Sequence, residues 1–424
     1  MAKDDEAAYD QTLPAADSSS GATTEDPDTL GSAPTEVATG ELGSSHYEIG
    51  GSLDGGTGPV DDEGVTDEHR GRYAVGRELG AGGIGRVFVA LDQHLGREVA
   101  LKELLPGAAE SSVGASGTRS PMELRFVNEA RVTGQLEHPG IVPVYELGRR
   151  DDGTIYYAMR LIRGRTLHQQ LEDRDLRRRL ELLPNFVELC QAVAYAHSRG
   201  VVHRDLKPDN VMIGDFGETV VLDWGLAKAR GKRDLQSKSL ARELEQLRDS
   251  SAHETVAGLP IGTPSFMPPE AALGMLDEID ERSDVYSLGA VLYQLLTGRP
   301  PFVGKTALEL VRQVVRDEPL APVEREPDCP AELSAIALHA LRHDKADRYA
   351  DAAELAKDVR TFLTGGLVGV HEYTPIVLIQ RWLRRNRRAL VATLLAVAVG
   401  SGAWLYRGYD VSRREAEARQ LAEA

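Results

Sequence analysis

The strongest constraint on the fold is a change of hydrophobic pattern along the chain. Between residues 72 and 104, the segments RYAVGRELG, RVFVALD and EVALKEL alternate apolar and polar side chains and are broken by glycines, as in short strands. Helical patterns take over from about Glu123, most clearly in residues 176–200, 287–298 and 331–343. A strand-rich start followed by a helix-rich remainder predicts an α+β chain with a small β-rich lobe and a larger helical lobe.

The net charge of −17 is concentrated near the N-terminus. Residues 1–70 carry 17 acidic and two basic side chains, whereas the other 354 residues carry 49 acidic and 47 basic ones. A segment this polar cannot bury enough apolar surface to offset the entropy lost on ordering, so we expect residues 1–70 to form a disordered acidic tail. We expect no nucleic-acid partner. Cys190 and Cys329 form no CxxC pair, which excludes a disulfide framework and fits a reducing compartment.

The C-terminal part has the pattern of a membrane anchor. Five arginines lie in residues 381–388, and an uncharged run, ALVATLLAVAVGSGAWLY, follows at 389–406. Eighteen residues give ~27 Å of helix, close to the ~30 Å hydrocarbon core of a bilayer. A buried helix of a soluble domain is the alternative, but the run lies after the globular part. We expect a basic juxtamembrane segment at 364–388, a transmembrane helix at 389–406 and a charged helical tail at 407–424.

Topology follows from where the arginines lie. The larger cluster precedes the apolar run, which favours a cytoplasmic location for the N-terminal side, although four arginines also follow the run. No apolar run follows Met1, so we expect no secretory signal peptide. These patterns predict a single-pass protein of the inner cell membrane that contacts lipid. Gly400-Ser401-Gly402 would allow two such helices to pack closely as a homodimer.

A glycine-rich motif, LGAGGIGRVFVALD, opens the strand region. Gly80, Gly82 and Gly85 give GxGxxG, with Val87 two residues later. The same spacing opens dinucleotide-binding folds, but a helix must follow there. The residues that follow here are strand-like, which favours a hairpin whose backbone N–H groups approach nucleotide phosphates. An ordinary β-hairpin is the alternative.

A lysine ends the third of these strands. In Val99-Ala100-Leu101-Lys102, the ammonium group can neutralise phosphate charge if a carboxylate holds it in place. Glu129, on the next predicted helix, is the expected partner. Ordinary surface charge is the alternative interpretation of both residues.

The segment VVHRDLKPDN, residues 201–210, carries three groups suited to phosphoryl transfer. Asp205 can accept the proton of an attacking hydroxyl, Lys207 can steady the transferring phosphoryl group, and Asn210 offers an oxygen to a metal ion. A glycine-rich loop, a strand lysine and this loop in that order are too specific for coincidence.

At this point the sequence resembles the eukaryotic-like, or Hanks-type, bacterial serine/threonine protein kinases. The resemblance covers about Tyr73 to Leu363, and Lys207 in HRDLKPDN is similar to the Ser/Thr rather than the Tyr branch. It implies a bilobal kinase fold over 73–363, ATP as cofactor with Mg²⁺ or alternatively Mn²⁺, and protein substrates that include the chain itself. It also implies direct in-line transfer of the ATP γ-phosphoryl group to a Ser or Thr hydroxyl.

Two triplets compete for the metal-binding aspartate that this family places about a dozen residues after the catalytic-loop asparagine. Asp215-Phe216-Gly217 matches the usual letters, but it starts only five residues after Asn210. Asp223-Trp224-Gly225 starts thirteen residues after it, which leaves room for a hairpin with residues 214–217 as the turn. We therefore assign the metal ligand to Asp223. Trp replaces the usual Phe, and DWGLAK resembles a subgroup of bacterial kinases.

The resemblance extends to the second half of the domain. GTPSFMPPE, residues 262–270, resembles the end of an activation segment, so Thr263 matches the threonine that contacts the catalytic Asp. Asp284 matches the aspartate that braces the catalytic loop. Arg348 matches the arginine that pairs with Glu270.

Two further sets of residues follow from the resemblance. Arg204, just before Asp205, implies control by phosphorylation of the activation loop, with Thr255 as the expected site and Ser250 and Ser251 as rivals. Besides the three glycines and Lys102, the expected lining of the nucleotide pocket is Leu79, Val87, Ala100, Met159, Leu161 and Met212.

An active, membrane-anchored kinase is the leading interpretation. A nucleotide-binding scaffold without activity and a structural membrane protein with an inert domain are the alternatives. Lys102, Glu129, Asp205, Asn210 and Asp223 are all present, and this favours the enzyme.

Overall fold

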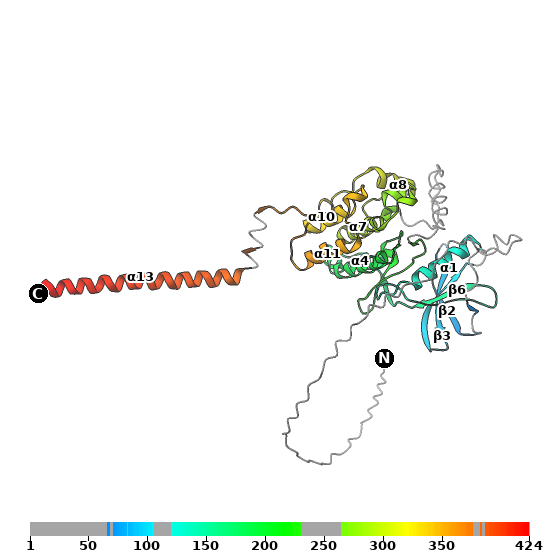
Figure 1. Ribbon diagram of the computed structural model, residues 1–424, viewed down its shortest axis with the longest axis horizontal. Coiled ribbons are helices and arrows are strands. Elements are labelled where there is room, and N and C mark those ends of the chain that lie inside the picture. The colour runs from blue at the N-terminus through cyan, green and yellow to red at the C-terminus, as the bar shows by residue number, and fades with distance from the viewer. Residues whose placement is uncertain are drawn as a thin grey trace, which may run out of the picture. The chain divides into compact units, whose positions relative to one another are not determined.

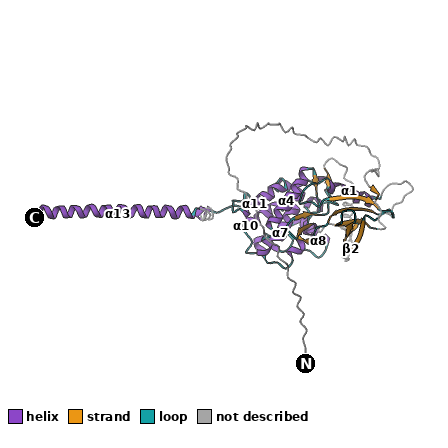
Figure 2. Ribbon diagram, turned by 90° about the horizontal axis from the view of Figure 1, so that it is seen from below, coloured by secondary structure: helices purple, strands orange, loops and turns teal. Residues whose placement is uncertain are grey.

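The computed structural model describes residues 66–67, 71–82, 84–105, 120–229, 264–375, 382–383 and 386–423. Strands gather in one lobe and helices in the other, as Figure 1 shows and as the colouring of Figure 2 makes plain. The predicted α+β, two-lobed architecture is therefore confirmed.

The small lobe is built on a six-stranded sheet with the order β1-β5-β6-β4-β3-β2. The strands are β1 (Thr66–Asp67), β2 (Tyr73–Ala81), β3 (Gly85–Asp92), β4 (Arg97–Leu104), β5 (Val144–Arg149) and β6 (Ile155–Arg160). All neighbours are antiparallel except β1 and β5. The sheet is strongly curled. Strands β2 and β5 lie near opposite ends of the strand order, yet the Tyr73 hydroxyl on β2 donates a 2.7 Å hydrogen bond to Glu146 on β5.

Two expectations about this lobe were wrong. Strands β5 and β6 lie beyond Glu123, where helical patterns were expected to dominate, because each is too short to show a clear period against its neighbours. Thr66–Asp67 fall within the segment expected to be disordered, yet they pair in parallel with Gly148 and Arg149 of β5. The other residues of 1–70 lie outside the described part of the chain.

The lobe has a single long helix, α1 (Pro121–Gly134), among its described residues. Its start is fixed by a capping box: the Ser120 hydroxyl accepts a hydrogen bond from the Glu123 amide, and the Glu123 carboxylate accepts one from the Ser120 amide. Phe126, Val127 and Ala130 are buried against β6 residues, which places this face of α1 on the sheet.

The large lobe is helical. Its principal helices are α2 (Leu167–Leu171), α3 (Leu176–Leu180), α4 (Leu183–Ser198), α6 (Pro269–Ala272), α7 (Glu281–Thr297), α8 (Ala307–Arg316), α9 (Pro322–Arg325), α10 (Ala331–Ala340) and α11 (Ala352–Leu363). Helix α7 is the centre of the core, with a run of fourteen buried residues, and α4, α10 and α11 pack around it.

Two boundaries differ from expectation. The run expected as one helix over 176–200 is broken into α3 and α4, since Pro184 lacks the N–H that would continue the hydrogen-bond ladder. The core also extends past the expected domain end at Leu363, because Val368 is only 2% exposed and packs in the large-lobe core.

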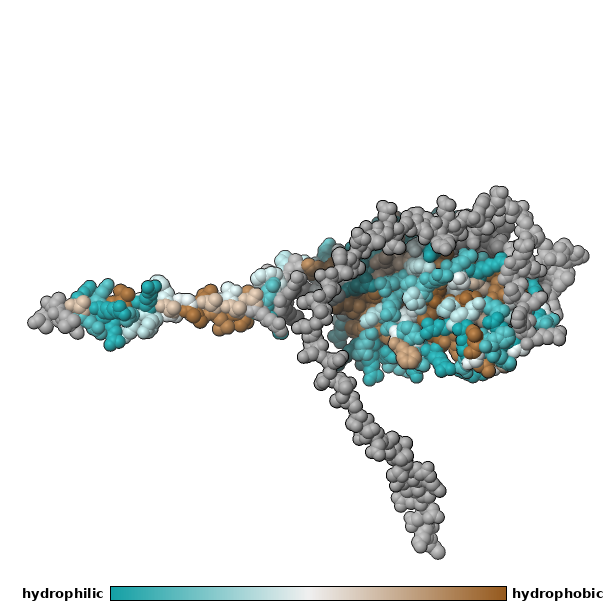
Figure 3. All heavy atoms as spheres, turned by 60° about the horizontal axis from the view of Figure 1, so that its bottom comes forward, coloured by the Kyte–Doolittle hydropathy of each residue, from teal (hydrophilic) through white to brown (hydrophobic). Residues whose placement is uncertain are grey.

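The last helix, α13 (Arg387–Glu423), contains the apolar run expected at 389–406 and the charged tail as one continuous element. Its apolar residues gather in one band, and hydrophilic residues cover its C-terminal end (Figure 3). Among the described residues this is the one helix long and apolar enough to cross a membrane, with a mean hydropathy of 1.8 over its most apolar window.

Candidate active site

A cleft of about 910 Å³ holds most of the residues singled out in the sequence. The small lobe contributes β2, β3, β4 and β6 to its walls, and the large lobe contributes the loops around β9 (Val211–Gly214) and β10 (Thr219–Val221). The expected nucleotide-pocket residues all line it: Leu79, Gly80, Gly82, Gly85, Val87, Ala100, Lys102, Met159, Leu161 and Met212. Glu129, Asn210 and Asp223 face the same cleft.

Gly85 is the motif glycine whose missing side chain the structure explains. A Cβ atom at this position would lie 2.6 Å from the carbonyl oxygen of Glu103 and 3.3 Å from the ring of Phe126. Glu103 is on β4, next to Lys102, so any side chain at Gly85 would push β3 away from the strand that carries the lysine. The glycine therefore allows close packing of strand, lysine and helix.

Lys102 and Glu129 form a buried ion pair, with 2.5 Å between Nζ and Oε1. Burial alone lowers the pKa of Lys102, but the charge of Glu129, with Tyr157 and Asp223 close by, raises it well above its ordinary value. Burial raises the pKa of Glu129, and Lys102 opposes that rise. The lysine is thus held cationic at the inner end of the cleft, where a phosphate would need it.

The catalytic-loop motif brings three side chains together. Lys207 Nζ lies 2.8 Å from Asp205 Oδ2, and the Asn210 side-chain amide donates to the same oxygen over 3.1 Å and to the Asp205 carbonyl over 2.8 Å. Burial raises the pKa of Asp205 above its ordinary value, with Lys207 opposing the rise. A carboxylate with a raised pKa beside a cleft suits a proton acceptor.

Asp284, on α7, fixes the backbone of the catalytic loop through hydrogen bonds. It is fully buried and accepts hydrogen bonds from the backbone amides of His203 at 2.8 Å and Arg204 at 2.9 Å, and it contacts His197 Nε2 at 2.8 Å. Burial raises its pKa, but the hydrogen bonds from His197 and His203 lower it below the ordinary value. Arg204 has a φ of 71°, which is strained for a non-glycine residue, so these bonds fix the backbone just before Asp205.

The two competing triplets occupy different places. Residues Val211–Gly214 and Thr219–Val221 pair as an antiparallel hairpin, and Asp215-Phe216-Gly217 forms its turn, as the spacing predicted. Phe216 is 98% exposed and Asp215 is exposed, whereas Asp223 lines the cleft. Burial raises the pKa of Asp223, but Lys102 and the Gly225 amide hold it below its ordinary value. The triplet with the usual letters therefore lies away from the cleft.

Trp224 is 1% exposed and belongs to the large-lobe core, which also includes Val132 at the end of α1. Its ring lies 4.6 Å from that of His203, at an angle of 51°. The larger aromatic residue thus packs against the catalytic loop, in a core that α1 also joins through Val132.

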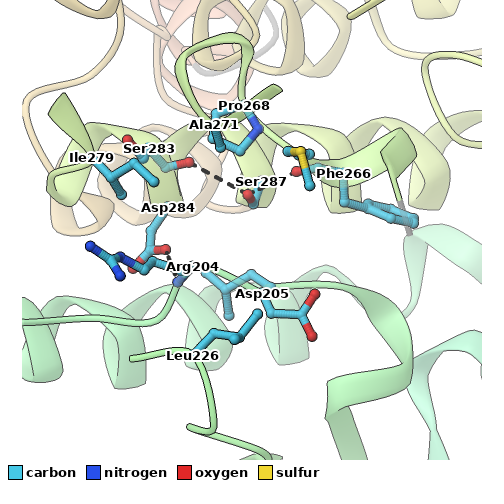
Figure 4. Close-up of a pocket in the computed structure, with 12 residues that line it drawn as sticks. Arg204, Asp205, Leu226, Phe266, Pro268, Ala271, Ile279, Ser283, Asp284 and Ser287 are labelled. Atoms are coloured by element: carbon cyan, nitrogen blue, oxygen red, sulfur yellow. Dashed lines mark hydrogen bonds between the residues drawn. The ribbon is translucent and has the colours of Figure 1, made fainter. Parts of the chain in front are cut away.

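The Arg348–Glu270 pair is bidentate, with N–O distances of 2.9 and 3.0 Å, and it is buried. It lies beside α7, whose Ser283, Asp284 and Ser287 line a small pocket together with Asp205, and of these three described residues only Asp284 is hydrogen-bonded to the catalytic loop (Figure 4). Thr263, Thr255, Ser250 and Ser251 lie outside the described residues.

The oxygen donors at the cleft fit a divalent cation. Asn210 uses its amide nitrogen on Asp205, which turns its amide oxygen the other way, and Asp223 supplies a carboxylate. These are hard oxygen ligands of the kind that Mg²⁺ takes together with substrate phosphates and water. Among the described residues, no cluster of three or more His, Cys, Asp or Glu side chains is placed to hold a metal ion.

Sequence reasoning missed Tyr157 and His197. The Tyr157 hydroxyl donates to Glu129 Oε1 over 2.7 Å, and His197 contacts Asp284 as described above. Neither has a motif of its own. Tyr157 could have been found only from the register of β4 and β6, which pairs it with Lys102.

The comparisons with known proteins identify the family. Residues 73–359 match the protein kinase domain family, so the chain belongs to that family. It is 37% identical over 309 residues to the serine/threonine-protein kinase PknD of Protochlamydia amoebophila, an alignment that covers 69% of this chain and 30% of that protein. It is 39% identical over 306 residues to a probable serine/threonine-protein kinase of Streptomyces coelicolor, covering 70% and 41%. The chain spans about a third of the length of the PknD relatives it matches.

Proposed function

We propose that this chain is an active, membrane-anchored serine/threonine protein kinase of signal transduction. The observation that carries the proposal is the convergence on one cleft of Lys102, Glu129, Asn210 and Asp223, with Asp205 bonded to Asn210 at its edge. The names of the relatives support the choice of Ser and Thr as acceptors. A scaffold without activity would not need all five of these side chains, nor the hydrogen bonds that join Lys102 to Glu129 and Asn210 to Asp205.

In this proposal ATP lies in the cleft, with its phosphates under the glycine-rich hairpin. Lys102 contacts the phosphates, and Asn210 and Asp223 hold Mg²⁺, which neutralises phosphate charge when bound. The substrate hydroxyl oxygen attacks the γ-phosphorus, the bond to the bridging oxygen of ADP breaks, and Asp205 accepts the hydroxyl proton. Oδ2 of Asp205 already receives Lys207 and Asn210, so Oδ1 is the oxygen we assign to that proton.

We propose that the kinase activity is regulated by autophosphorylation of the activation loop. Arg204 directly precedes the catalytic aspartate in the chain, and the phosphate of a phosphorylated loop residue would pair with its guanidinium group. Thr255 is our first choice for that residue. The protein would then be both enzyme and substrate.

Phosphate transfer by a soluble fragment of residues 65–375 tests the activity. With MgATP and a generic protein substrate, Asp205→Asn is expected to lower the rate by about 10²- to 10³-fold, because the proton acceptor is lost. Mass spectrometry of the wild-type protein is expected to find phosphate on Thr255. If ATP binds but wild type and Asp205→Asn transfer phosphate equally slowly, the scaffold interpretation replaces the enzyme.

The membrane anchor is tested separately. We expect the full chain to remain in the membrane pellet after extraction at alkaline pH, because transfer of the 389–406 run into hydrocarbon is favourable. Removing residues 389–424 should release the protein to the supernatant. Recovery of the full chain in the soluble fraction would refute the proposed transmembrane helix at 389–406, but it would not bear on the proposed kinase activity.

A further inference from the structure

Tyr157 contacts the Lys102–Glu129 pair from a position that no motif marks. It lies on β6, directly opposite Lys102 on β4, so both side chains project from the same face of the sheet. Its hydroxyl donates to Glu129 Oε1 over 2.7 Å, and the Lys102 ammonium lies 5.7 Å from its ring centre. Tyr157 is 4% exposed, so water competes little for its hydroxyl.

The ring of Tyr157 makes a second contact with helix α1. Its centre lies 5.2 Å from that of Phe126, at an angle of 49°. Phe126 precedes Glu129 by three residues, so both lie on the same face of α1. Tyr157 therefore contacts α1 at two residues: its ring packs against Phe126, and its hydroxyl is hydrogen-bonded to Glu129.

The hydroxyl matters because Glu129 has few donors. Both Lys102 and Tyr157 donate to Oε1, while Oε2 is buried and has no hydrogen-bond partner among the described residues. A buried carboxylate with a missing donor is costly, and the cost falls if the helix moves and the carboxylate reaches water. Removing the hydroxyl would therefore favour outward movement of α1.

We propose that Tyr157 is a positioning residue that holds α1 against the sheet and keeps Glu129 on Lys102. Lys102 holds Glu129 through opposite charge. Tyr157 is neutral and contacts α1 both through its ring, at Phe126, and through its hydroxyl, at Glu129. Its effect on phosphoryl transfer rests on the proposed function. Its effect on the position of α1 does not.

Hydrogen–deuterium exchange of the full chain in detergent micelles tests the position of α1 without reference to activity. Tyr157→Phe keeps the ring and removes the hydroxyl, so amides of α1 are expected to exchange about tenfold faster than in wild type. Tyr156→Phe is the matched control, since Tyr156 is the preceding residue, is also buried, and packs against Tyr73 in a cluster that contains no residue of α1. Exchange in α1 that is unchanged in Tyr157→Phe, or raised equally in both variants, would overturn the proposal.

Steady-state kinetics of the same proteins give the second readout. With MgATP and myelin basic protein, Tyr157→Phe is expected to lower kcat/KM for ATP by about tenfold, with Tyr156→Phe within twofold of wild type. In a Glu129→Leu background, adding Tyr157→Phe should change exchange in α1 by less than twofold, because the acceptor of the hydroxyl hydrogen bond is already gone. An undiminished effect in that background would also overturn the proposal. Inactivity of every protein, wild type included, would contradict the proposed function while the exchange result still decides the role of Tyr157.

Discussion

Asp223→Ala is expected to abolish phosphate transfer, with a fall in rate of about 10³-fold, while Asp215→Ala leaves the rate within twofold of wild type. The physical reason is placement. Asp223 lines the cleft near Lys102, which lowers its pKa and keeps it ionised as a cation ligand. Asp215 lies in an exposed hairpin turn and is not among the residues that line the cleft. The measurement is phosphate transfer with MgATP by residues 65–375.

Two further variants make this comparison sharper. Asp223 has a φ of 55°, a conformation that Asn tolerates better than Ala. Asp223→Asn therefore removes the negative charge with less backbone strain, and it should be nearly as inactive as Asp223→Ala. Phe216→Ala should have full activity, since its side chain is 98% exposed. Full activity of Asp223→Ala, or a large loss in Asp215→Ala, would contradict the assignment.

The position of the β9–β10 hairpin was predictable from the sequence. Two strands and a turn need a minimum number of residues between Asn210 and the next aspartate that lines the cleft, and this number can be read from the local sequence. The first three expected strands were likewise confirmed as β2, β3 and β4, because each has a full alternating pattern bounded by glycine. In both cases, the alternation of apolar and polar residues and the number of residues between motifs were sufficient to predict the structure.

The residues that were missed depend on tertiary pairing. The contact of Tyr157 with Glu129 needs the register of β4 against β6, which the hydrophobic pattern of one strand does not contain. Val368 joins the core after a turn in which Gly365 has a φ of 73°, so no helical period leads to it. Thr66–Asp67 pair with β5 through backbone groups, which any polar sequence could supply.

Arg348→Met is expected to lower the free energy of unfolding by about 3–5 kcal/mol. The Arg348 side chain is fully buried, and it donates to both oxygens of Glu270 and to the carbonyl oxygens of Arg282, Arg342 and His343. Replacing it with an apolar side chain of similar length removes all of these donors, and the buried Glu270 carboxylate keeps only the hydrogen bond from the Ser283 hydroxyl. Urea unfolding of residues 65–375, followed by tryptophan fluorescence, measures the loss.

The matched control is an exposed pair of the same chemistry. Arg163 contacts Glu98, but their side chains are 72% and 47% exposed, so Arg163→Met should cost about 0–1 kcal/mol. Adding Glu270→Gln to Arg348→Met removes the unpaired charge and should recover part of the lost stability, since charge burial is the largest part of the cost. If Arg348→Met costs no more than Arg163→Met, the pair does not hold α6 to the end of the large lobe.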